Sequence, residues 1–161
     1  MLDVRNERES DGQKSSNAEA RAVRAVVQAL LIRGIPQKDI GIIAPFRAQV
    51  ANVRRHLFSD HEMSGWQALS PASPMSIDTV DRFQGGERLV IIMSFATSQT
   101  PGAESPLREF LTNPTRLNVA LTRAQRKLIV VGCAPALETL PHFQRLLAYC
   151  RSMDTVITYC E

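Results

Sequence analysis

The strongest constraint on the fold of this chain is a set of short apolar runs separated by amphipathic segments. The clearest runs are IGIIA at 40–44, LVIIMSF at 89–95 and LIVVG at 128–132. Runs without an alternating polar face are typical of strands that are buried on both sides of a parallel sheet. Further strands are expected at 76–80, at 155–160 and, as an edge strand, at 1–4; the rest of 1–16 is read as a loop. The sequence therefore predicts an α/β fold, a doubly wound, mostly parallel sheet with helices on both faces.

Helical spacing of apolar residues recurs between these runs. Helices are expected at about 17–33, 46–57, 113–124 and 141–151. Ser16 or Asn17 can cap the first helix, and Gly34 ends it. The segments 58–74 and 97–112 are rich in Ser, Pro and Gly, and both are predicted to be loops.

A basic helix directly precedes the last of the three apolar runs. Asn113 can accept hydrogen bonds from the first helical amides, and Pro114 fits the first helical position. Arg116 and Arg123 are seven residues apart, so we expect both to leave this helix on nearly the same face. Two guanidinium groups beside a buried strand are suited to binding phosphate, but a solvated basic face explains this stretch alone equally well.

Composition narrows the classes of protein further. At 161 residues the chain is long enough for one domain with its own core. The net charge is +3, and only three of the 19 basic residues are lysines, so nearly all positive charge is guanidinium. The three cysteines lack metal-ligand spacing, and no apolar run approaches the length of a membrane span. These features are typical of a reduced intracellular protein and are compatible with nucleic acid as a ligand.

The segment DTVDRFQGGE at 78–87 concentrates polar groups between two strands. Thr79 offers a hydroxyl, Gln84 an amide and Glu87 a carboxylate, while Gly85 and Gly86 let the backbone approach a ligand closely. A tight turn that merely needs its glycines is the alternative interpretation of the same segment.

The position of candidate sites follows from the predicted sheet. Ligands of parallel sheets bind at the carboxyl ends of the strands. The loop at Pro45, the turn at 81–87 and the ends of the 128–132 strand are therefore the candidate sites. The sequence holds no G-x-x-x-x-G-K-S/T phosphate loop, no G-x-G-x-x-G fingerprint, no G-x-S-x-G elbow and no H-E-x-x-H pair, and no metal site is predicted.

Three segments together resemble motifs IV, V and VI of superfamily 1 helicases of the up-frameshift type, a group that includes senataxin and the DNA replication helicase-nuclease. The segments are IGIIAPFRAQV at 40–50, SIDTVDRFQGGERLVIIMS at 76–94 and NPTRLNVALTRAQRKLIVVG at 113–132. Their order and spacing also agree, and NAEARAVRAVVQALLIRG resembles the helix before motif IV, so the resemblance covers nearly the whole chain. A VDxFQGxE segment followed by RLNVALTRA is a highly specific combination.

The resemblance implies a RecA-like fold and an ATP-dependent function. Helicases of this family consist of two RecA-like domains with ATP and Mg²⁺ in the cleft between them. Residues 1–161 are similar to the second domain only, so the first RecA-like domain, with the phosphate loop and the Mg²⁺ ligands, is expected to be absent from this chain and to act in cis. Single-stranded DNA or RNA is the implied partner, with a lean toward DNA-processing relatives, and the nucleus or cytoplasm is the implied location.

The resemblance also implies roles for individual residues. Arg123 matches the arginine finger that reaches the γ-phosphate held by the other domain. Nucleotide contact is implied for Glu87, Gln84 and Gly85, and Arg116 matches an arginine at the start of motif VI that is either structural or lines the cleft. Contact with the nucleic-acid backbone is implied for Thr79, Pro45 and Arg47. Two departures weaken the match: the family usually has a basic residue at Gly86 and a second arginine at Thr115.

Three functions are compatible with these observations. The first is the C-terminal motor domain of a 5′-to-3′ helicase, which hydrolyses ATP only when it is joined to a first domain. The second is a catalytically inactive RecA-like module that binds nucleic acid or protein, which the departures at Gly86 and Thr115 favour. A Rossmann enzyme is the third, and the missing glycine fingerprint argues against it.

Overall fold

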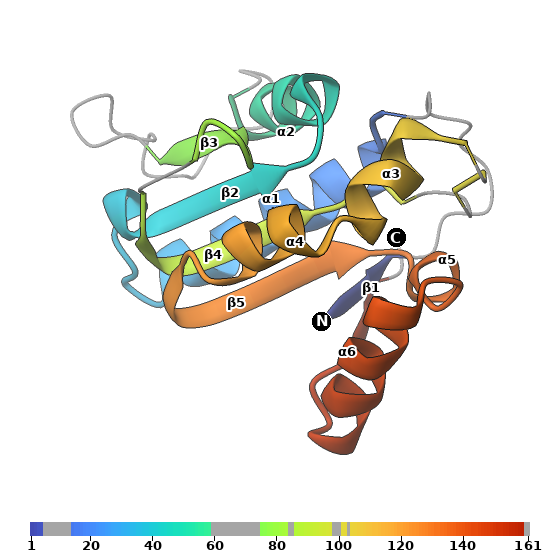
Figure 1. The fold of residues 1–161 in the computed structure, drawn as a ribbon. Helices are drawn as coiled ribbons and strands as arrows, with labels where there is room; N and C mark the ends of the chain where they lie inside the picture. Colours follow the sequence, from blue (N-terminus) through green and yellow to red (C-terminus); the bar gives the residue numbers. More distant parts are fainter. Residues whose placement is uncertain (5–13, 59–74, 84–85, 98–100, 103, 160–161) are drawn as a thin grey trace.

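The structure, a computed structural model, describes residues 1–4, 14–58, 75–83, 86–97, 101–102 and 104–159. Six strands form one sheet with the order β3-β2-β4-β5-β1-β6, and every neighbouring pair is parallel (Figure 1). The strands are β1 (Leu2–Val4), β2 (Ile40–Ala44), β3 (Ser76–Thr79), β4 (Arg88–Ser94), β5 (Ala124–Gly132) and β6 (Ile157–Tyr159). The predicted α/β class with a parallel sheet is confirmed.

Helices cover both faces of this sheet. The helices are α1 (Asn17–Ile32), α2 (Arg47–Phe58), α3 (Pro106–Thr112), α4 (Pro114–Leu121), α5 (Ala134–Leu137) and α6 (Pro141–Ser152), with a short 3₁₀ turn η1 (Gln37–Asp39) before β2. Figure 1 shows α4 in front of the sheet and α1 behind it. None of the helices in the described part is long and apolar enough to span a membrane.

The central strands supply side chains to two separate hydrophobic cores. Ile92 of β4 packs in the core beneath α1 and α2, whereas its neighbours Ile91 and Met93 pack in the core beneath α3, α4 and α6. All five residues of β2 are buried, as are the last five of β4. This burial on both faces explains why these runs lack polar alternation.

The strand predicted at 1–4 lies inside the sheet and not at its edge. Leu2 pairs with Val131 of β5 and with Ile157 of β6, so β1 lies inside the sheet. A three-residue strand survives there because ladders on both sides satisfy its backbone groups. The prediction of a strand at 1–4 is confirmed and its edge position is wrong.

The predicted loop at 97–112 contains a helix. Ser105 caps α3 by accepting from the Arg108 amide at 3.2 Å, and Pro106 occupies the first turn. Leu107, Phe110 and Leu111 are buried against the core, which stabilises this two-turn helix. A helix this short depends on tertiary packing rather than on its own propensity, so composition alone indicated a loop.

The basic helix is shorter than its apolar pattern predicts. Asn113 caps α4 by accepting from the Arg116 amide at 3.1 Å, as expected, but the helix ends at Leu121. The backbone then enters β5 at Ala124, because the Arg88 amide donates to the Arg123 carbonyl at 3.1 Å and begins the ladder with β4. Arg116 and Arg123 therefore do not share a helix, and the prediction that they project from one helical face is wrong.

The other predicted elements agree with the structure. Ser16, rather than Asn17, caps α1, and Gly34 follows its end with a φ of +82°, a value that favours glycine. The last helix and the last strand lie where the sequence places them. The segment 59–74, with the lone Trp66, lies outside the described residues.

Candidate functional site

The predicted site residues divide between opposite edges of the sheet. Since all strands are parallel, their carboxyl ends share one edge and their amino ends share the other. Thr79 ends β3, and the Pro45–Arg47 segment follows β2, so these lie at the carboxyl edge. Glu87 and Arg123 directly precede β4 and β5 and lie at the amino edge. The structure therefore places two candidate sites on this domain, one of them at the edge where parallel sheets do not usually bind ligands.

Arg123 is held at the amino edge by its own backbone and by part of its side chain. Its Nε donates to the Val119 carbonyl at 2.8 Å, which fixes the plane of the half-buried guanidinium group. Its two terminal nitrogens make no hydrogen bond or ion pair with the described part of the chain. The group is thus oriented, charged and able to donate to an anion.

Glu87 lies next to Arg123 because of the register between β4 and β5. Arg88 is paired with Ala124, so the residues that precede them are also neighbours across the two strands. The exposed Glu87 carboxylate accepts from the Gln125 amide at 3.4 Å. The backbones of Glu87 and Arg123, 36 residues apart in the chain, are therefore neighbours, while their side chains bond to Gln125 and to the Val119 carbonyl and form no ion pair with each other.

Arg116 makes a different contact. Its Nε lies 3.9 Å from the Asp81 carboxylate, and both side chains are largely exposed. This ion pair connects the first turn of α4 to the turn after β3, and exposed pairs of this kind contribute little to stability. Gln84 and Gly85, the two other residues with a predicted nucleotide role, lie outside the described residues.

At the carboxyl edge, Thr79 closes β3 with its backbone fully used. Its amide donates to the Asp78 carboxylate at 2.8 Å, and its carbonyl accepts from the Phe83 amide at 2.9 Å. Arg47 is exposed at the start of α2, and Pro45 is half-buried before it. The three predicted nucleic-acid contacts therefore share one edge, on the adjacent strands β2 and β3.

Sequence reasoning missed a buried carboxylate at the same edge. Glu19, in the first turn of α1, accepts from the Ser94 hydroxyl at 2.7 Å, from the Ala96 amide at 2.8 Å and from the amide and hydroxyl of Thr97 at 2.6 and 3.0 Å. Burial raises the pKa of Glu19, and these four hydrogen bonds oppose the shift. The S-x-x-E capping pattern from Ser16 to Glu19 indicates the start of the helix, but it does not indicate that the carboxylate is buried.

Gln49 extends this buried polar network to α2. Its amide nitrogen donates to the Ser94 hydroxyl at 2.9 Å, and its amide oxygen accepts from the Ser16 backbone at 2.8 Å. The side chain is completely buried and joins the start of α1, the start of α2 and the end of β4. The network of Ser16, Glu19, Gln49, Ser94 and Thr97, called the buried polar network below, therefore fixes the loop that carries Pro45 and Arg47.

Neither edge presents a metal centre within the residues that the structure describes. No group of three or more His, Cys, Asp or Glu side chains is close enough there to hold a metal ion. The chemistry that these residues offer is hydrogen bonding to hydroxyl groups by Glu87 and charge neutralisation by Arg123.

Comparisons with known proteins identify the family of the chain. A family model described as an AAA domain matches residues 1–135. The chain is 35% identical over 146 residues to the bovine DNA replication ATP-dependent helicase/nuclease DNA2, covering 91% of this chain and 12% of that protein. It is 41% identical over 157 residues to the chicken putative helicase MOV-10, covering 91% of this chain and 16% of that protein. The chain thus spans less than a fifth of the length of these relatives.

Proposed function

This chain belongs to the AAA domain family as the C-terminal helicase region of superfamily 1 helicases, and on that premise we propose that it is the second motor domain of an ATP-dependent 5′-to-3′ helicase. Its parallel sheet, covered by helices on both faces, is the RecA-like fold. The proposal includes ATP with Mg²⁺, a first RecA-like domain in cis that holds the Mg²⁺ ligands, and a location in the nucleus or cytoplasm. The adjacency of Glu87 and Arg123 at the amino edge is the observation that supports it most.

The amino edge of the sheet suits one side of a nucleotide cleft. The terminal nitrogens of Arg123 are available to a γ-phosphate held by another domain, and its Nε bond to Val119 keeps them aimed. A guanidinium group in that position neutralises the charge that develops during phosphoryl transfer. Glu87 is placed to accept from a ribose hydroxyl. Arg116 lies apart from this edge, near Asp81 in the turn after β3, and its largely exposed side chain stays available to a ligand.

The carboxyl edge of the sheet suits a nucleic-acid track. Arg47 offers an exposed cationic side chain at the start of α2, and Thr79, at the end of the neighbouring strand β3, carries a hydroxyl on a side chain that is 8% exposed. Hydrogen bonding and positive charge of this kind position a sugar–phosphate backbone without reading its bases. Because the buried polar network fixes this edge, movement of the domain during each cycle of hydrolysis would carry the bound strand along.

A chimera tests the nucleotide role. The corresponding region of the bovine DNA2 relative would be replaced by this chain, and ATP hydrolysis would be measured with and without single-stranded DNA. We expect stimulated hydrolysis, and a loss of about a thousandfold or more for Arg123→Ala because an arginine finger contributes at least that much. Arg145→Ala on α6, which makes the same change of charge on an exposed residue, should leave the rate unchanged. Equal rates for Arg123→Ala and the parent chimera would exclude the finger.

An inactive binding module is the second candidate, and the residues at 86 and 115 favour it. Neither Gly86 nor Thr115 supplies the positive charge that the family usually has there. Packing does not explain the glycine, because a Cβ at Gly86 would meet Phe83 at an ordinary 3.5 Å. A chimera that binds single strands but shows no stimulated hydrolysis would identify this module, and a gain of hydrolysis with Gly86→Arg would show why.

A further inference from the structure

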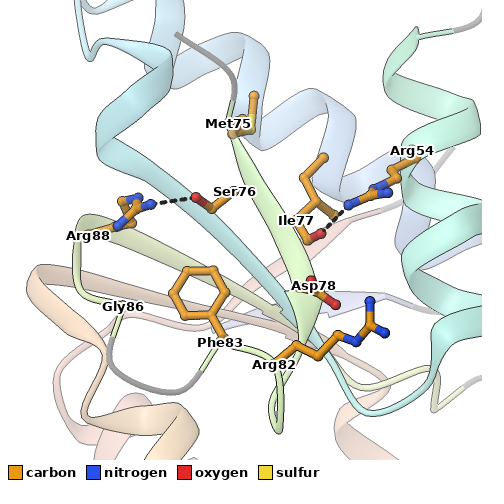
Figure 2. Close-up of a pocket in the computed structure, with 9 residues that line it drawn as sticks. All are labelled: Arg54, Met75, Ser76, Ile77, Asp78, Arg82, Phe83, Gly86 and Arg88. Carbon is orange, nitrogen blue, oxygen red and sulfur yellow. Dashed lines mark hydrogen bonds between the residues drawn. The ribbon is translucent and has the colours of Figure 1, made fainter.

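A groove of about 410 Å³ runs along β3, one of the two edge strands of the sheet (Figure 2). Three arginines line it from three different elements: Arg54 from α2, Arg82 from the turn after β3 and Arg88 from the start of β4. Asp78 is the single acidic residue among the described residues of its lining. We call this feature the arginine groove. Its lining carries a clear excess of positive charge.

The positive charge of the arginine groove is not compensated inside the described part of the chain. None of its three guanidinium groups forms an ion pair there, and the exposed side chain of Arg82 forms no hydrogen bond there either. Arg88 donates to the Glu87 carbonyl at 2.7 Å and to the Ser76 hydroxyl at 2.6 Å, while its Nε is buried without a partner. Uncompensated guanidinium groups that converge on one groove favour an anionic ligand.

The free edge of β3 does not favour an added peptide strand. Arg54 Nη2 donates to the Ile77 carbonyl at 2.6 Å, and the Thr79 amide and carbonyl are bonded to Asp78 and Phe83. Strand addition depends on free backbone groups at a sheet edge. Since these groups of β3 already have partners, recognition in this groove has to come from the arginine side chains.

The groove is also unsuited to stacking bases. Among the described residues that line it, Phe83 is the only aromatic one, and its side chain is 6% exposed. The Arg88 guanidinium group lies 5.9 Å from the centre of the Phe83 ring and covers it. A ligand of this groove would therefore be recognised by its negative charge rather than by its bases.

The arginine groove continues the proposed track. Its lining includes Asp78, next to Thr79 at the carboxyl edge, and Gly86 and Arg88 at the amino edge. We propose that it binds the phosphates of single-stranded nucleic acid after the strand passes Thr79, along the outer side of β3. This inference rests on the proposed nucleic-acid function and names a second stretch of the path, with binding that is independent of sequence.

Salt-dependent binding of the 161-residue chain to a fluorescent dT oligonucleotide tests this path. Each phosphate contact contributes about −0.7 to the slope of log K against log salt concentration. One contact therefore raises the affinity roughly fivefold at 0.1 M salt relative to 1 M salt. We expect Arg82→Ala to reduce the magnitude of the slope and the affinity by these amounts, and Arg82→Lys to retain the slope because the charge is kept. Arg145→Ala is the matched control, since it removes an exposed arginine from α6 and should change neither quantity.

The outcomes separate the groove from the track. One possible result is that Thr79→Ala or Arg47→Ala weakens oligonucleotide binding while Arg82→Ala has no effect. This result would contradict the role of the arginine groove and leave the proposed function standing. Absence of oligonucleotide binding by the unmodified chain would contradict both. A polyglutamate peptide serves as the second probe: if Arg82→Ala weakens its binding and leaves the oligonucleotide unaffected, the groove takes acidic protein segments and our proposal is wrong.

Discussion

The carboxyl edge of the sheet and the groove along β3 differ in how far their polar side chains have hydrogen-bond or ion-pair partners within the protein. At the carboxyl edge, the buried Glu19 carboxylate receives four donors, and Gln49 uses both ends of its amide. Along β3, the charge of Arg54, Arg82 and Arg88 has no carboxylate partner among the described residues. Satisfied buried groups make a region rigid, whereas unpaired charge at a surface is available to a ligand. The first region therefore fixes the shape of the domain, and the second is suited to contact with an anion.

Removal of the carboxylate should produce the largest effect on the rigid region. In Glu19→Ala, the Ser94 hydroxyl and the Ala96 and Thr97 amides lose their acceptor, and each buried unsatisfied donor costs about 1–3 kcal/mol. We expect the free energy of unfolding, measured with urea, to fall by about 3 kcal/mol or more. The control Glu104→Ala, at an exposed residue without a hydrogen bond in the described part, should stay within about 0.5 kcal/mol of the parent. A similar small change in both variants would show that the network does not stabilise the fold.

The pH dependence of stability should reveal the same carboxylate. Burial raises the pKa of Glu19 above 4.5, so the folded state binds its proton more tightly than the unfolded state does. Its contribution to stability is therefore greatest below pH 4.5 and decreases as the pH rises through the folded-state pKa. We expect urea unfolding at several pH values to show this loss. The difference in free energy of unfolding between the parent chain and Glu19→Gln should decrease from pH 4.5 up to the folded-state pKa and stay constant at higher pH. An advantage that grows with pH would mean that the hydrogen bonds outweigh burial.

The exposed pair at the turn after β3 should give the smallest effect. Arg116 and Asp81 are both largely exposed, and pairs of this kind contribute about 0–1 kcal/mol. A double-mutant cycle of Arg116→Ala and Asp81→Ala, followed by thermal unfolding, should give a coupling free energy below about 1 kcal/mol. A larger coupling would show that this surface resembles the rigid region after all, and that Arg116 is committed to the turn rather than available to a ligand.

The sheet could be predicted from the sequence because parallel strands that are buried on both faces consist of continuous apolar runs, without alternating polar residues. The end of α4 could not, since Leu121 and Ala124 continue the helical spacing while Arg88 draws the Arg123 backbone into the β5 ladder. The short helix α3 was not predicted for the same reason, because its stability comes from contacts with the core. In both places long-range contacts outweigh the local pattern.

Candidate residues could be named from the sequence, but their arrangement could not. Glu87 and Arg123 become neighbours through the register of β4 and β5, which no spacing within either motif encodes. Glu19 looked like an ordinary charged helical residue, because only Ser94, Ala96 and Thr97, far along the chain, make its environment buried. Hydrogen-bond partners of this kind are set by the tertiary fold, so local patterns identify the chemistry and leave the geometry undetermined.

The interior position of β1 has a consequence for synthesis on the ribosome. Leu2 pairs with Val131 and Ile157, which come much later in the chain. The residues of β1 therefore leave the exit tunnel long before β5 and β6 have been synthesised. The three strands β2, β3 and β4 are consecutive in the chain and can assemble first, whereas β1 can join only after β5 has formed, and β6 then completes the sheet. Pairings between distant residues slow folding and prolong the exposure of unpaired strands. A nascent chain that stalls before β5 would therefore present β1 and the edge of β4 to chaperones.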